Sequence, residues 1–179
     1  MIDPLILMPV SLGFAIFWAL SGLHKLNNFQ WFIQVLTGYE LFPKRLIGLM
    51  AMAVPVIEIS VAAALALKSS IGLFGSVALL AVYTLLLIFN TLRGHELSDC
   101  GCHWGEGSGD GGGKMKSYIY RNLLLMAAMM TMLIPTGSRH LGLLDWVNVV
   151  LALAFLSVSF LAVISLYSNF QKMKATGYV

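Results

Sequence analysis

Charged residues are scarce in this 179-residue sequence: only 11% of its residues are charged, whereas 59% are hydrophobic. Soluble domains carry about 25% charged residues and about 45–50% apolar residues. The composition therefore excludes an ordinary soluble domain and indicates an integral membrane protein. The net charge of +3 is small and dispersed along the chain, so nucleic acid is not an expected partner.

Two other features are missing from the sequence. Its start, Met1-Ile2-Asp3-Pro4, has no basic residue, and no small-residue cleavage site follows the first apolar run. We therefore expect that run to be a retained helix and not a signal peptide. The glycine-rich stretch 105–113 lacks the spacing and helix context of a phosphate-binding loop. It indicates a flexible tether and not a nucleotide site.

Apolar segments long enough to cross a bilayer make up most of the chain. A spanning helix needs about 20 residues, and a helix in lipid satisfies its own backbone hydrogen bonds. The sequence predicts an all-α membrane bundle, a single domain with transmembrane segments at 5–23, 46–67, 71–92, 118–134 and 146–167. The fourth segment spans only if Arg121, near its start, reaches the interface. A four-helix protein with this segment half inserted is the alternative.

Two connections between these segments have a distinct composition. Residues 27–39 mix aromatic and amide side chains without charge, which predicts an amphipathic helix lying in the membrane interface. Residues 93–117 form a polar loop that is rich in cysteine and glycine. This loop contains both cysteines of the chain, so its position relative to the membrane determines the chemistry that it can perform.

The distribution of basic residues predicts the orientation. With five spans, the N-terminus, Lys68 and Arg139 share one face, and most other basic residues, such as Lys44 and Arg93, lie on the opposite face. The positive-inside rule then places the N-terminus outside and the C-terminus in the cytoplasm of a bacterial inner membrane. The cysteine loop also falls on the cytoplasmic side, where thiols are kept reduced.

The segment Cys100-Gly101-Cys102-His103 carries the clearest chemical signal. A disulfide across one intervening residue closes a small ring, and strained disulfides tend to be the labile or catalytic ones. Gly101 permits the backbone angles that such a ring needs, and a protonated His103 would favour the thiolate. A static disulfide or two inert thiols are one alternative. A zinc site that also uses His95 is another.

Polar residues inside the apolar segments are the second signal. Glu58 lies in the middle of the second segment, where an ionised carboxylate costs roughly 2.5–3.5 kcal/mol. It is expected to be protonated or paired, facing the bundle interior. A structural bond to Lys25, Arg121 or a hydroxyl is one interpretation, and a proton or quinone contact is the other. Lys25 itself is expected to anchor the end of the first segment.

Several short elements resemble one family. They are Ser21-Gly22-Leu23-His24-Lys25-Leu26, Tyr39-Glu40-Leu41-Phe42-Pro43, Pro55-Val56-Ile57-Glu58, Cys100-Gly101-Cys102-His103-Trp104-Gly105 and Arg121-Asn122. In this order they resemble the methylamine utilisation protein MauE family, within the DoxX-like group of small integral membrane proteins. His103 replaces the phenylalanine of the family pattern, and Trp104 is an additional residue. These two departures leave the particular client protein open.

The resemblance implies a function. The family is regarded as accessory to maturation of a disulfide-rich periplasmic enzyme subunit, of the methylamine dehydrogenase kind, alongside a thioredoxin-like partner. It therefore implies that Cys100 and Cys102 support thiol–disulfide redox maturation or assembly of an envelope enzyme, without a resident cofactor; quinone and zinc are the minor alternatives. The other candidate function is a non-catalytic accessory subunit of a larger respiratory or photosynthetic membrane complex.

Overall fold

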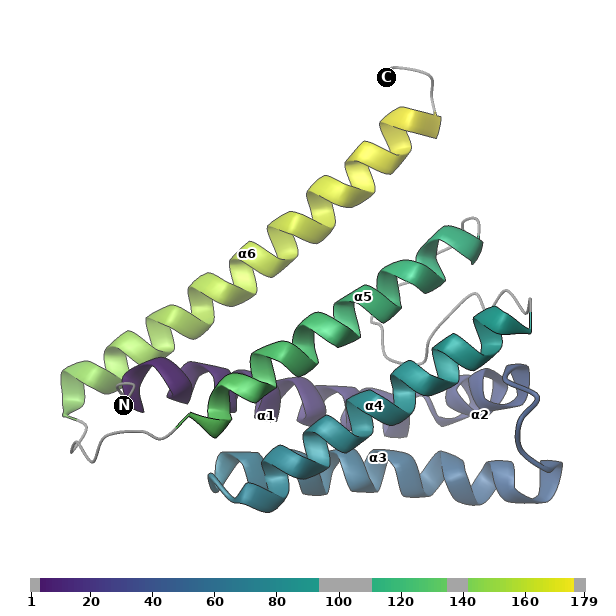
Figure 1. Ribbon diagram of the computed structural model, residues 1–179, viewed down its shortest axis with the longest axis horizontal. Coiled ribbons are helices and arrows are strands. Elements are labelled where there is room, and N and C mark those ends of the chain that lie inside the picture. The colour runs from purple at the N-terminus through teal and green to yellow at the C-terminus, as the bar shows by residue number, and fades with distance from the viewer. Residues whose placement is uncertain (1–3, 94–110, 135–141, 176–179) are drawn as a thin grey trace. The chain divides into compact units, whose positions relative to one another are not determined.

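The computed structural model describes residues 4–93, 111–134 and 142–175, and these residues contain helices and no strands, which confirms the all-α prediction (Figure 1). The elements are α1 (Pro4–Asn27), α2 (Phe29–Gly38), α3 (Lys44–Ala66), α4 (Ser70–Leu92), α5 (Gly111–Met130), the 3₁₀ turn η1 (Thr131–Leu133) and α6 (Leu143–Ala175).

The five apolar segments predicted from the sequence overlap α1, α3, α4, α5 and α6, and the fourth, 118–134, continues past the end of α5 through η1. Among the residues that the structure describes, three helices are long and apolar enough to cross a membrane, at Leu7–Asn27, Lys44–Ala66 and Ser70–Leu92. Tyr118–Leu133 and Leu143–Ser159 are shorter apolar helices. The protein is therefore a helical membrane protein, and the choice between five and four crossings stays a prediction.

The chain divides into two compact units. One contains Val10–Pro135, and the other combines Met1–Pro9 with Thr136–Val179. In the second unit, α6 begins with a local cap in which the backbone N–H of Gly142 donates to Asp145 Oδ2 at 2.9 Å. Asp145 in the first turn also complements the positive end of the helix dipole. The functional residues discussed below belong to the unit Val10–Pro135.

A break at Asn28 separates α1 from α2. The Asn28 side chain donates to the carbonyl of His24 at 3.0 Å, so it satisfies a carbonyl at the end of α1. Beyond the break, α2 buries Phe32 and Leu36 against Ile47 and Ala51 in the first half of α3. A helix is therefore present where the sequence predicted an amphipathic one, and its apolar side packs on a candidate membrane span.

A tight turn joins α3 to α4 as a helical hairpin. Lys68 adopts a left-handed conformation with φ of 53°, and Ser69 caps α4 by accepting a hydrogen bond from the N–H of Ile71. Gly72 permits the backbones to approach closely, because a Cβ at this position would lie 2.5 Å from the backbone nitrogen of Leu65. Small residues at such contacts are typical of membrane helix pairs.

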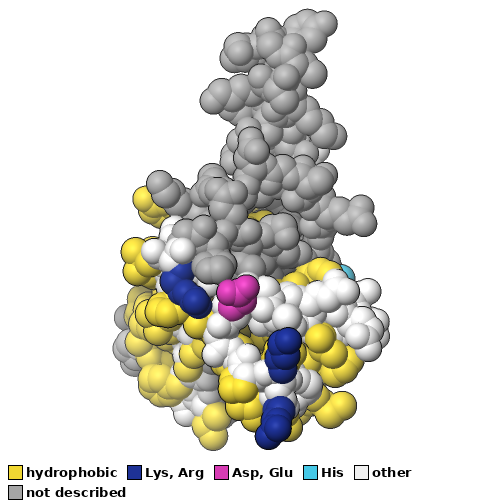
Figure 2. All heavy atoms as spheres, turned by 90° about the vertical axis from the view of Figure 1, so that its right-hand side faces the viewer, with side chains coloured by type: hydrophobic (Ala, Val, Ile, Leu, Met, Phe, Trp, Pro, Cys, Tyr) yellow, Lys and Arg dark blue, Asp and Glu magenta, His cyan; other side chains and the backbone are white. Residues whose placement is uncertain are grey.

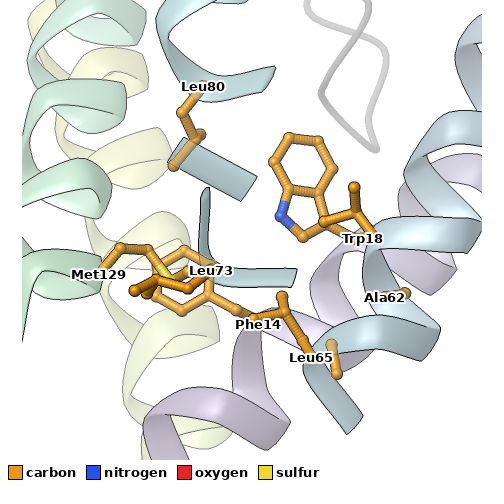
Figure 3. Close-up of a cluster of buried hydrophobic side chains, with 9 residues drawn as sticks. Phe14, Trp18, Ala62, Leu65, Leu73, Leu80 and Met129 are labelled. Atoms are coloured by element: carbon orange, nitrogen blue, oxygen red, sulfur yellow. The ribbon is translucent and has the colours of Figure 1, made fainter. Parts of the chain in front are cut away.

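An apolar cluster fills the region between α1, α3, α4 and α5 (Figure 3). It includes Phe14 and Trp18 from α1, Leu65 from α3, Leu80 from α4 and Met129 from α5, all buried. Helices α4 and α5, which precede and follow the cysteine segment in the sequence, also pack against each other. The cysteine segment therefore begins and ends on one packed pair of helices.

One end of the hairpin is basic. Lys44 and Arg45 begin α3 and Arg93 follows α4, and all three are exposed. Figure 2 shows that basic side chains and one acidic side chain gather on this end. The chain leaves α4 toward Cys100 and Cys102 from the same end, so the basic residues flank the departure point of the cysteine segment.

Candidate functional site

A buried ion pair lies inside the unit Val10–Pro135, where Lys25 Nζ at the end of α1 contacts Glu58 Oε1 in the middle of α3. The two side chains are 1% and 0% exposed. Lys25 was one of three bonding partners expected for Glu58 from the sequence, and the structure brings these two residues together. Burial of one charge without the other would be far more costly than burial of the pair.

Two hydroxyl groups complete the network around the ion pair. The Lys25 ammonium also donates to Ser21 Oγ and to the Tyr83 hydroxyl, each at 3.1 Å. Ser21 and Tyr83 in turn donate to Glu58 Oε1. An ammonium has three N–H donors, so Lys25 is fully satisfied, and each hydroxyl both accepts from the cation and donates to the anion.

The carboxylate is satisfied on one oxygen only. Oε1 accepts from Lys25, Ser21 and Tyr83, whereas the equally buried Oε2 has no hydrogen-bond partner. A carboxylate offers acceptor sites on both oxygens. Within the part of the chain that the structure describes, half of this group is therefore left without a donor.

Aromatic rings enclose the pair. Lys25 Nζ lies 5.3 Å from the ring centre of Phe32 in α2 and 5.0 Å from that of Tyr83 in α4. The Tyr83 ring stacks on Trp18 at 6.1 Å, and the Trp18 indole donates to Ser76 Oγ at 2.6 Å. Helices α1, α2, α3 and α4 therefore all contribute a side chain to this site.

Gly22 brings α1 close enough to α3 for the pair to form. A Cβ at Gly22 would lie 2.8 Å from Ile59 Cγ1 and 2.9 Å from the carbonyl oxygen of Pro55. Gly22 and Lys25 belong to the first motif that resembled the family, and Pro55 and Glu58 belong to the third. The structure therefore places these two short motifs in direct contact.

Arg121 lies apart from the ion pair. Its guanidinium donates to Asn122 Oδ1, at 3.2 Å for the shorter of the two contacts, and lies over the Tyr118 ring at 5.3 Å. Arg121 was one of the partners expected for Glu58, but the hydrogen bonds to Glu58 Oε1 come from Lys25, Ser21 and Tyr83 instead. Its partly buried side chain is instead engaged near the start of α5.

Sequence reasoning overlooked Tyr83 and Asn90 as polar side chains inside an apolar segment. Ser76, Tyr83 and Asn90 recur every seven residues along α4, and this spacing places them on one face of the helix. Ser76 and Asn90 are fully buried. The seven-residue period was visible in the sequence and would have indicated a polar stripe that faces other helices.

The cysteine site lies outside the described residues. Cys100, Cys102 and His103, together with His95 of the metal hypothesis, fall within 94–110, so their roles stay predictions. Among the residues that the structure does describe, no group of three or more His, Cys, Asp or Glu side chains could hold a metal ion. A shallow groove on α4 is lined by apolar side chains such as Leu85 and Phe89, which offer no polar group to orient a ligand.

The sequence was compared with known proteins. The model of the family "Methylamine utilisation protein MauE" matches residues 3–135. Two relatives carry the name methylamine utilization protein MauE. The protein from Paracoccus denitrificans is 29% identical over 104 residues, which are 57% of this chain and 56% of that protein. The protein from Methylophilus methylotrophus is 32% identical over 102 residues, which are 56% of this chain and 54% of that protein.

The two alignments therefore span little more than half the length of these relatives. No solved structure matches this chain. The family match contains α1 to α5, the Lys25–Glu58 pair and both cysteines, and it ends at the same residue as the unit Val10–Pro135. It covers well over half of the sequence, and so this chain belongs to the methylamine utilisation protein MauE family.

Proposed function

We propose that this protein is an inner-membrane accessory factor that supports thiol–disulfide maturation of an envelope enzyme. The observation that carries the proposal is the family match, because it includes the only two cysteines of the chain within residues 3–135. The relatives are named for methylamine utilisation, which makes an enzyme of amine oxidation the first client to test.

The proposed chemistry is reversible exchange between two cysteine pairs. The thiolate of Cys100 or Cys102 attacks one sulfur of a partner disulfide, which forms a mixed disulfide and releases the partner's other sulfur as a thiolate. The second cysteine then attacks the mixed disulfide and releases the partner as a dithiol. Two electrons move from one pair to the other, so the step needs no resident cofactor. His103 favours the thiolate when it is protonated.

The proposed orientation gives this pair a specific place in an electron path. The N-terminus lies outside and the C-terminus in the cytoplasm, so Cys100 and Cys102 face the cytoplasm. A thioredoxin-like protein on that side is the proposed redox partner, and a second membrane protein with its own cysteine pair passes the two electrons across the membrane to the envelope enzyme, the eventual client. The basic residues Lys44, Arg45 and Arg93 surround the departure point of the cysteine segment, and they suit a partner with an acidic surface.

The test compares Cys100→Ser and Cys102→Ser with the wild-type protein in its native host. Removal of the resolving cysteine blocks the second attack, so one of the two variants accumulates a mixed disulfide that a reducing agent releases. In both variants we expect the ratio of free thiols to disulfides in envelope proteins to differ from that of the wild type, as measured by differential alkylation and mass spectrometry. Ser98→Ala in the same segment is the matched control and leaves thiol content unchanged.

The proposal fails if both cysteine variants leave envelope thiol content and partner cross-linking at wild-type levels. The alternative of an accessory subunit predicts a different result. In that case the chain migrates with a multi-subunit complex at fixed stoichiometry after purification in a gentle detergent, and the cysteine variants migrate in the same way.

A further inference from the structure

Four buried polar atoms in α3, α4 and α5 have no hydrogen-bond partner in the described part of the chain: Glu58 Oε2, Asn90 Nδ2, Asn90 Oδ1 and Asn122 Nδ2. Their side chains are at most 1% exposed. Two of these atoms are donors and two are acceptors. An ion could satisfy only one kind of atom, whereas water both donates and accepts, and buried water typically makes about three hydrogen bonds to such groups.

These atoms lie toward one end of the bundle. Tyr83, which contacts Glu58, and Asn90 are seven residues apart on one face of α4, a rise of about 10 Å. Asn122 of α5 lies seven residues before Met129, which belongs to the same apolar cluster as Leu73 and Leu80 of α4. Because α5 runs antiparallel to α4 (Figure 1), Asn122 lies on the side of Met129 that is toward the C-terminal end of α4.

The other side of the ion pair is different. Toward the α3–α4 turn, Phe14, Leu65, Leu73 and Met129 form a closed apolar cluster (Figure 3). The buried polar groups there have protein partners. Ser11 donates to the carbonyl of Leu65, and Trp18 donates to Ser76. Apolar cavities of protein interiors stay dry, so this side offers water no favourable position.

We propose that internal water fills a polar seam formed by Glu58, Tyr83, Asn90 and Asn122 and connects Glu58 to the aqueous phase at the C-terminal end of α4 alone. Asn90 lies two residues before the end of α4 at Leu92, so the chain of waters reaches the basic end of the bundle.

The polar seam is therefore a binding site for water and exchangeable protons. The titratable groups that contact Glu58 are Lys25 from α1 and Tyr83 from α4, and both bond to Oε1. Oε2 is the oxygen left to accept a hydrogen bond from water. Glu58 then exchanges protons with a single side of the membrane, a property that does not depend on the cysteines or on the proposed redox function.

The experiment is hydroxyl-radical footprinting of the full-length protein in lipid nanodiscs. Radiolysis produces radicals from water, so internal water oxidises the buried side chains beside it. We expect Tyr83 to be oxidised several-fold faster than Phe14, which reacts comparably with the radical but lies in the apolar cluster. Phe89, exposed on the outer face of α4, is the control for lipid contact and stays protected.

Two variants test the route. Asn90→Leu removes two of the unpartnered atoms and keeps the number and branching of the side-chain heavy atoms, and we expect it to lower the oxidation rate of Tyr83 several-fold. Thr84→Val is the matched control, because the Thr84 hydroxyl already donates to the Leu80 carbonyl at 2.6 Å. It leaves the rate at Tyr83 unchanged.

Three results would overturn the proposal. Equal protection of Tyr83 and Phe14 in the wild-type protein would mean that the seam is dry. An unchanged Tyr83 rate in Asn90→Leu would mean that water reaches the site by another route. Rapid oxidation of Phe14 would mean that water enters from both ends.

Discussion

At the scale of single residues, the arrangement around Glu58 explains why an acidic side chain is tolerated in the middle of an apolar helix. The Lys25 ammonium neutralises the charge, and Ser21 and Tyr83 donate to the same oxygen. The gain from these contacts offsets the desolvation of two charges, and it depends on all partners being in place. Loss of one partner therefore lowers the free energy of unfolding more than replacement of the whole pair by apolar residues.

A double-mutant comparison tests this dependence. We expect Glu58→Leu alone or Lys25→Met alone to lower the free energy of unfolding by about 3–5 kcal/mol, because each leaves a buried charge unpaired. The double variant is expected to be more stable than either single variant. Thermal unfolding in detergent measures all three, with Lys44→Met at an exposed position as the control. Single variants no less stable than this control would contradict the interpretation.

Part of this arrangement was predictable from the sequence. The depth of Glu58 in an apolar run showed that it needs a partner, and Lys25 was among the candidates, together with Arg121 and a hydroxyl group. The contact itself depends on how α1 crosses α3, and no local pattern encodes that crossing. The burial of Asn122 was hidden for the same reason, because burial of a polar side chain depends on its neighbours in space.

At the scale of helices, the approach of α1 to α3 at Gly22 positions the ion pair. A methyl group there would meet Ile59 and the Pro55 carbonyl at 2.8 and 2.9 Å, which is closer than real Cβ atoms come. The backbone oxygen cannot rotate away as a side chain can. The two helices must therefore separate, and the bond from Lys25 to Glu58 lengthens with them.

Gly22→Ala is expected to destabilise the protein by about 1–3 kcal/mol through this overpacking. Gly48→Ala is the matched control in α3, because no atom lies within 4 Å of a Cβ there. Alanine favours the helix over glycine by about 1 kcal/mol, so the control is neutral or slightly stabilised. Thermal unfolding of both variants under one condition makes the comparison, and equal midpoints would exclude a tight contact at Gly22.

The helices were more predictable than their contacts. Apolar runs alone were enough to define α3 and α4 almost to their ends, because a membrane helix depends mainly on its own length and composition. In contrast, α5 begins at Gly111, inside the glycine-rich stretch that the sequence indicated as a tether. The packing of α2 on α3 was also missed, since residues 27–39 have the composition of an interfacial helix.

At the scale of the whole molecule, charge distribution is the main guide to orientation. Lys44, Arg45 and Arg93 lie at the end of the α3–α4 hairpin that carries the cysteine segment. Only Lys68 lies in the turn at the other end. Basic residues close to spanning helices resist transfer across the membrane, so the end with three of them is expected to stay in the cytoplasm.

Reporter fusions test this orientation. An alkaline phosphatase domain, which is active only outside the cytoplasm, is expected to be active when fused after Ser69 and inactive when fused after Arg93. Replacement of Lys44, Arg45 and Arg93 together by alanine removes the bias and is expected to produce a mixed orientation. Activity only at the Arg93 fusion would contradict the prediction and would place the cysteine segment in the envelope.

The order of the ion-pair partners along the chain has a consequence for biogenesis. Lys25 is synthesised before Glu58, and α1 is complete when α3 leaves the ribosome. Glu58 can therefore meet its counter-charge as soon as it enters the bilayer. Tyr83 follows in the next helix, joined to α3 by a tight turn, so α3 and α4 can insert together as a hairpin. The ion pair thus helps a costly segment to integrate, before it stabilises the finished fold.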